Sequence, residues 1–160
     1  MKPTDFAVYL RAFLGHYLPI QRNASANTIS GYRYAFVLLL SYCQRNCKLP
    51  VEDLCLEDVD AQRVLGFLDY IVKERGVSAH TRNHRLAALH SFFRYVQMQS
   101  PEHLAHCQRI LAIPMQRCSQ ADPNYLSVTA LAALLAQPDR STRRGRRDAV
   151  LLSVLYDTKN

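Results

Sequence analysis

Apolar residues recur at intervals of three and four along the first 111 residues, which is the spacing of amphipathic helices. Thr4 can cap a first helix that runs to about Leu18, where Pro19 closes it. Ser25 or Asn27 starts a second helix that reaches about Asn46. The pattern thus predicts two amphipathic helices in the first third of the chain.

Two longer helices and a short one follow. The first is predicted over about 60–75, with Gly76 as its stop signal. Ser78 can cap the next, over about 79–99, and a short helix covers about 102–111. Because every strong element is helical and the connections are short, we predict an all-α fold: a compact bundle of four to five helices.

The periodicity disappears at 112–125, where two prolines and scattered polar residues indicate a linker. Ser127 then begins a helix that Pro138 ends, and a closing helix starts at about Arg146. Residues 126–160 are too few for an independent domain. We therefore predict a helical domain over 1–111, a linker, and two further helices that begin a second domain.

Composition narrows the class of protein. The 160 residues include only 5 glycines and 7 prolines, which favours helices, and 49% are hydrophobic, enough for a core. The net charge of +7 suggests an anionic partner, most commonly nucleic acid, although a merely basic protein would show the same surplus. The five cysteines show no framework spacing, and the sequence has neither a signal peptide nor an apolar run of membrane length. We therefore predict a cytoplasmic protein without a membrane partner.

The start of the fourth predicted helix, "SAHTRNHRLAALHSFFRY", concentrates hydrogen-bond donors. Donor side chains near a helix N-terminus suit phosphate oxygens and base edges, while an apolar stripe packs beneath them. An ordinary solvated helix start would have a similar composition. The candidate DNA contacts here are His80, Thr81, Arg82, His84 and Arg85.

Two other stretches have the same character. At the start of the second helix, Asn27, Thr28 and Arg33 are candidate contacts, and Gly31 would allow close approach of a partner or, more often, of a neighbouring helix. In "RSTRRGRR", Arg143 and Arg144 are candidate phosphate contacts, with a solvated loop as the plain alternative.

The patterns of metal and cofactor sites are missing. His80 and His84 are four residues apart, as zinc ligands can be, but no Glu follows His80 and no third ligand is obvious. Cys43 and Cys47 have the same spacing without a second pair. We expect no metal, no cofactor and no small-molecule substrate, because no phosphate loop or nucleophile motif is present either.

Four stretches, in this order, resemble the tyrosine recombinases, the phage-integrase type of site-specific recombinase: "SANTISGYRYAFVLLLSYC", "GVSAHTRNHRLAALHSFFRYV", "YLSVTALAALL" and "GRRDAVLLSVLYDT". The first two look like the long helices of the family's N-terminal core-binding, SAM-like domain. The third looks like the start of the catalytic domain. The resemblance implies double-stranded DNA as the partner and self-association with other recombinase protomers.

The fourth stretch is the most specific. In the family this helix continues from Asp-Thr into Gly, one variable residue and the first catalytic Arg. This sequence has Lys159 in place of that Gly and ends at Asn160. The resemblance thus implies a truncated chain without catalytic residues, expected to bind DNA and to be inactive in recombination, whether the cause is a natural stop, a frameshift or a cut.

Two rival interpretations stay open from the residues. One is a helical protein–protein interaction module without DNA binding, whose apolar helix over 149–156 docks on a partner. The other is an enzyme of unfamiliar type. We rank it last, because no constellation of acid, base and nucleophile is visible.

Overall fold

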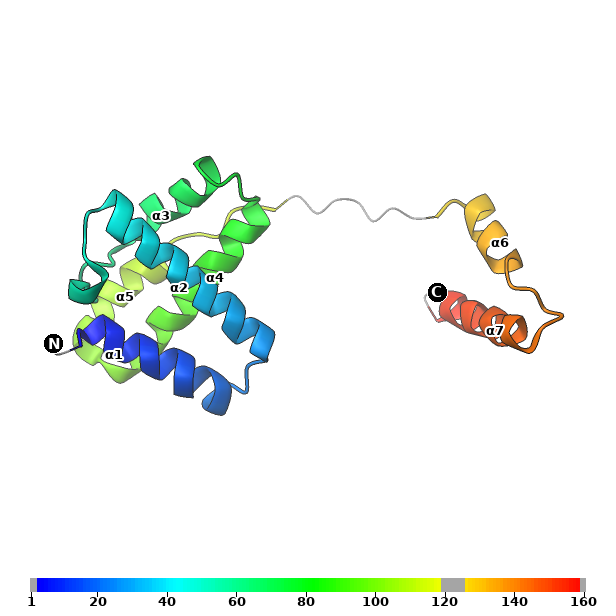
Figure 1. The fold of residues 1–160 in the computed structure, drawn as a ribbon, viewed down its shortest axis with the longest axis horizontal. Helices are drawn as coiled ribbons and strands as arrows, with labels where there is room; N and C mark the ends of the chain where they lie inside the picture. Colours follow the sequence, from blue (N-terminus) through cyan, green and yellow to red (C-terminus); the bar gives the residue numbers. More distant parts are fainter. Residues whose placement is uncertain (1–2, 119–125, 159–160) are drawn as a thin grey trace. The chain divides into compact units, whose positions relative to one another are not determined.

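The computed structural model describes residues 3–118 and 126–158. Every regular element in these ranges is helical, and no strand occurs in them, so the predicted all-α fold is confirmed. The chain divides into two units between Cys118 and Ser119. Both units are drawn in Figure 1, and the extent of the domains predicted from the sequence stays a prediction.

The first unit consists of α-helices and one π-helical segment, joined by short connections. α4 (Ala79–Gln99) lies against α2 (Ala26–Asn46), α3 (Ala61–Lys73) and α5 (Leu104–Leu111), and α2 crosses over α4 in Figure 1. Two short 3-10 turns, η2 (Val51–Asp53) and η3 (Pro101–His103), precede α3 and α5. The longer elements are α1 (Asp5–Ala12), η1 (Phe13–Gln21), α2 (Ala26–Asn46), α3 (Ala61–Lys73), α4 (Ala79–Gln99) and α5 (Leu104–Leu111).

Side-chain caps define where most of these helices begin. Thr4, Ser25, Asp60 and Ser78 each accept a hydrogen bond from the backbone N–H three residues later. At the other end of α3, Gly76 adopts a φ of 60° and its N–H donates to the carbonyl of Val72 at 3.1 Å. The predicted caps at Thr4, Ser25 and Ser78 and the predicted stop at Gly76 are thus confirmed, and Asp60 adds a cap at the predicted start of its helix.

The first helix does not end at Pro19, so that prediction is wrong. The chain changes from α-helix to π-helix at Phe13 and continues in this form to Gln21, with Pro19 inside. A π-helix bonds each N–H to the carbonyl five residues back, as Arg22 does with Tyr17 at 2.9 Å. Proline lacks an N–H in either register, but the wider turn of the π-helix relieves the clash of its ring with the carbonyl four residues back, so the helix continues through Pro19.

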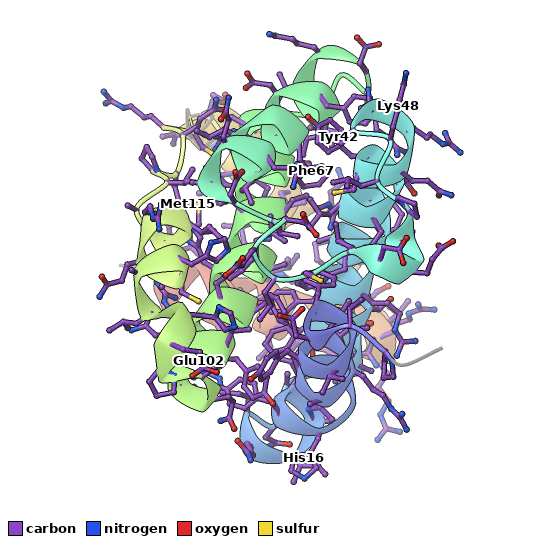
Figure 2. All side chains as sticks on the ribbon, turned by 90° about the vertical axis from the view of Figure 1, so that its left-hand side faces the viewer. His16, Tyr42, Lys48, Phe67, Glu102 and Met115 are labelled. Atoms are coloured by element: carbon purple, nitrogen blue, oxygen red, sulfur yellow. The ribbon has the colours of Figure 1, made fainter. Side chains whose placement is uncertain are left out.

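Aromatic rings fill the centre of the first unit. The ring of Phe92 meets those of Phe6, Phe13 and Phe36 edge-on, with centroids 5.2–5.5 Å apart. Edge-to-face packing is a favoured geometry for such rings. Tyr42 and Phe67 extend the packing between α2 and α3, at a centroid distance of 6.0 Å, and both are labelled in Figure 2.

The first unit extends beyond α5 into the predicted linker. Ile113 is 6% exposed and joins the core, and Gln116 exchanges two hydrogen bonds with the side chain of Asn83 on α4, at 2.7 and 2.9 Å. The first part of the 112–125 stretch therefore packs on the bundle. The rest, 119–125, lies outside the described residues.

The second unit has two described helices, α6 (Val128–Ala136) and α7 (Arg143–Asp157). Ser127 caps α6 as predicted. α7 begins three residues earlier than the predicted start at Arg146, because the Thr142 side chain accepts a hydrogen bond from the N–H of Gly145 at 3.0 Å. Lys159, where the sequence departs from the family pattern, and Asn160, where it ends, lie outside the described residues.

In the ranges that the structure describes, no helix combines the length and the apolar character needed to cross a membrane.

Candidate nucleic-acid interface

A groove of about 510 Å³ opens between the first turns of α2 and α4. It brings together candidate residues that are more than 50 positions apart in the sequence, as the pair Gly31 and Arg85 illustrates. None of its lining residues carries a carboxylate. The lining residues are Asn27, Thr28, Gly31, Tyr32, Thr81, His84, Arg85 and Ala87.

Both helices that form the groove begin with a serine cap followed three residues later by a threonine. On α2 the Ser25 hydroxyl accepts from the N–H of Thr28 at 3.2 Å, and the two hydroxyls lie 2.9 Å apart. On α4 the Ser78 hydroxyl makes the same contacts with Thr81, at 3.3 and 3.2 Å. Because a helix N-terminus carries a partial positive charge, the groove lies beside two positive helix ends.

Arg85 connects the two helices across the groove. Its Nη1 donates to the carbonyl oxygen of Gly31 at 3.3 Å, and its guanidinium carbon lies 4.8 Å from the centroid of the Tyr34 ring. Its Nε is buried and has no hydrogen-bond partner in the described part of the chain. The structure therefore holds a cation at the groove while leaving most of its donors unused.

Gly31 faces the groove and does not pack against a neighbouring helix. A Cβ built at this position meets no atom within 4 Å, so the favoured expectation of helix–helix packing at Gly31 is wrong. The glycine keeps the groove open at its α2 side, directly where Arg85 reaches the backbone. The other role considered for Gly31, close approach of a partner, stays a prediction.

His84 and His80 form a pair at the edge of the groove. Their Nε2 atoms lie 2.9 Å apart, so one ring donates a hydrogen bond to the other. Both side chains are exposed. No third ligand joins them, and nowhere in ranges 3–118 and 126–158 does a group of three or more His, Cys, Asp or Glu side chains have the arrangement of a metal site.

Several predicted contacts lie away from the groove. Arg82 is only 5% exposed, with its Nη1 donating to the Oδ1 of Asn83 at 3.3 Å, so it faces the bundle. Arg33 is exposed on α2 without lining the groove. Arg143 and Arg144 are exposed in the first turn of α7, in the second unit.

Sequence reasoning missed Tyr32 and Ala87 as lining residues, and Tyr34 as the aromatic neighbour of Arg85. A signal for two of them exists. Tyr32 is one helical turn beyond Thr28, and Ala87 is three residues beyond His84, so both share a face with a predicted contact. Nothing in the local pattern marks Tyr34, because its partner comes from a different helix.

Residues 10–99 match the family described as phage integrase, N-terminal SAM-like domain. The chain is 43% identical to the integrase/recombinase y4rC of Sinorhizobium fredii over 157 residues, which cover 98% of this chain and 47% of that protein. It is 29% identical to the tyrosine recombinase XerD of Listeria innocua over 143 residues, 89% of this chain and 46% of that protein.

A third relative is the tyrosine recombinase XerC of Syntrophus aciditrophicus, 27% identical over 144 residues, 89% of this chain and 45% of that protein. The chain spans about half the length of the curated relatives it matches. No solved structure matches the chain. These matches favour the recombinase interpretation over that of a helical interaction module.

Proposed function

The chain belongs to the phage integrase, or tyrosine recombinase, family, whose N-terminal SAM-like domain it carries, and from this premise we propose that its first unit binds double-stranded DNA through the groove between α2 and α4. It would serve as the DNA-binding front part of a site-specific recombinase. The observation that carries the proposal is the convergence of two capped helix starts and Arg85 on one groove free of carboxylates.

The groove offers the groups that DNA needs. The hydroxyls of Thr28 and Thr81, the helix N-termini and the guanidinium of Arg85 suit phosphate oxygens. The carboxamide of Asn27 and the ring of His84 can also reach hydrogen-bonding groups on base edges. Phosphate contacts would position the unit on the duplex, and these two side chains would supply any preference for sequence.

The test is a fluorescence-anisotropy titration of the chain with a labelled duplex, from about 50 mM to about 200 mM salt. Binding should weaken with salt, with a slope of about −0.9 per phosphate contacted in a plot of log affinity against log salt. The variant His84→Ala/Arg85→Ala should bind more weakly and lose about one unit of slope.

Arg109→Ala is the matched control for charge. Arg109 is exposed on α5 and its Nε donates to the carbonyl of Ala105 in its own helix, outside the groove. This variant should bind like the unchanged chain. Absence of binding at low salt, or equal losses in the two variants, would overturn the proposal.

Arg143 and Arg144 would add phosphate contacts from the second unit. The variant Arg143→Ala/Arg144→Ala should therefore lower the salt slope without changing any sequence preference.

The chain would self-associate with other recombinase protomers on DNA, which sedimentation with and without duplex would test. The activity would take place in the cytoplasm, where the DNA is.

A further inference from the structure

Tyr34 lies between two arginines from different parts of the first unit. On one side, the guanidinium of Arg85 on α4 lies over the Tyr34 ring, at 4.8 Å from its centroid. At the end of the ring, Nη2 of Arg75, from the connection between α3 and α4, donates to the Tyr34 hydroxyl at 3.4 Å. Tyr34 itself is 44% exposed, so it is not a core residue.

Arg85 needs such a support to act as a fixed group. Arginine has a long side chain with many rotamers, and immobilising it on a ligand costs conformational entropy. Two contacts reduce that cost in advance: the hydrogen bond from Nη1 to Gly31 and the cation–π contact of the guanidinium with the Tyr34 ring. Of its five N–H donors, only one is used among the described residues. Because Nε is buried, the remaining N–H groups of the two Nη atoms are the ones that can serve an external acceptor.

We infer that Tyr34 is a positioning residue: its ring holds the Arg85 guanidinium at the groove, preorganised for a phosphate oxygen of DNA. This inference rests on the DNA binding proposed above. The ring, and not the hydroxyl, carries the role, because the guanidinium of Arg85 lies over the ring whereas the hydroxyl accepts a hydrogen bond from Arg75. Tyr34 does not line the groove, so it acts through Arg85.

Three variants separate the ring from the hydroxyl in the same anisotropy titration with a labelled duplex at low salt. Tyr34→Leu removes the cation–π contact and should weaken binding by about 3- to 10-fold. Tyr34→Phe keeps the ring and should bind like the unchanged chain. Arg75→Ala removes the hydrogen bond to the hydroxyl. It should change DNA binding no more than removal of another exposed cation does.

A double-mutant cycle distinguishes positioning from a merely structural role. In an Arg85→Ala background, Tyr34→Leu should cause no further loss, because no guanidinium remains to be held. A structural role predicts the same fold-loss in both backgrounds. Thermal unfolding without DNA should be alike for Tyr34→Leu and Tyr34→Phe, since the side chain is exposed.

Each outcome has one meaning. If the unchanged chain binds DNA and Tyr34→Leu binds equally well, or loses equally in both backgrounds, the positioning role is overturned while the proposed function stands. If the unchanged chain binds no duplex, the proposed function falls and the inference with it. Loss in Tyr34→Leu, retention in Tyr34→Phe and no loss on top of Arg85→Ala would establish the role.

Discussion

The two units of the chain contain similar apolar helices but bury them to very different extents. In α4, Leu86 and Leu89 are fully buried, because α2, α3 and α5 all pack against this helix. In α7, Leu151 and Leu155 are 53% and 61% exposed, and within the second unit the helix packs against α6. An apolar stripe thus shows which face of a helix can be buried, but only the neighbours decide whether it is.

The clearest way to break this contrast is to truncate one side chain in each unit. Phe92→Ala removes a fully buried ring from the aromatic core and should lower the free energy of unfolding by about 3–5 kcal/mol. Leu155→Ala should change it by less than about 0.5 kcal/mol, because its side chain is largely exposed. Urea unfolding followed by circular dichroism measures both, and similar losses would show that the second unit is packed as tightly as the first.

Two helical glycines sharpen the contrast at the level of single contacts. A Cβ at Gly145 would collide with the backbone of Asp139, so Gly145→Ala should destabilise the start of α7 by about 1–3 kcal/mol. A Cβ at Gly31 meets open space, so Gly31→Ala should stabilise α2 by up to about 1 kcal/mol. Amide hydrogen exchange should become faster in α7 for the first variant and slower in α2 for the second, and the reverse order would contradict both assignments.

A smaller effect should appear on acidification of the first unit. His90 is 6% exposed, and its Nε2 donates to the carbonyl of Ile110 at 3.1 Å. Burial lowers its pKa; the hydrogen bond to Ile110 opposes this shift, and the nearby charge of Arg94 adds to it. Because the unfolded chain then binds a proton more readily, stability is present above the unfolded pKa of about 6.5 and is lost as the pH falls towards the folded pKa.

The corresponding measurement is the urea midpoint at about pH 7.5 and about pH 5.5, where only histidine among the common side chains titrates. The midpoint should be lower at the acidic value. His90→Gln should flatten this difference, whereas His16→Gln, at an exposed position on η1, should leave it intact. A pH dependence that survives in His90→Gln would assign the effect to another group.

The smallest effect is expected from removing the second unit altogether. The buried hydrophobic cluster of the first unit runs from Phe6 to Ile113 and contains no residue of the second unit. Deleting 119–160 should therefore change the free energy of unfolding of the bundle by less than about 0.5 kcal/mol. Thermal unfolding of the shortened chain tests this, and a loss of several kcal/mol would mean that the bundle depends on the second unit.

Local signals predicted most of the fold. Thr4, Ser25 and Ser78 cap helices at the expected positions, because a cap bonds an N–H only three residues away. The same reasoning was wrong at Pro19, where it assumed an α-helical register that the chain exchanges for a π-helix. It also placed the start of α7 too late, because the run of arginines after Thr142 suggested a loop.

The candidate site was predicted less completely, and the arginines show why. Arg82 and Arg85 lie three positions apart in the same donor-rich stretch, yet the first is 5% exposed and the second lines the groove. The amino-acid composition of this stretch gives no means of telling the two arginines apart. Only the packing of α4 against the rest of the bundle decides which of the two faces outwards.

By itself, then, the sequence determined the helical class, the capped helix starts and the resemblance to a recombinase family, because these depend on residues within one helical turn or on an ordered series of motifs. The tertiary structure alone decided that α2 and α4 begin beside the same groove, that Gly31 faces it, and that Tyr34 supports Arg85. The contact between Arg85 and Gly31 joins residues 54 positions apart. The helical periodicity that predicts each helix specifies its apolar face but not the partner or the crossing that brings two such residues together.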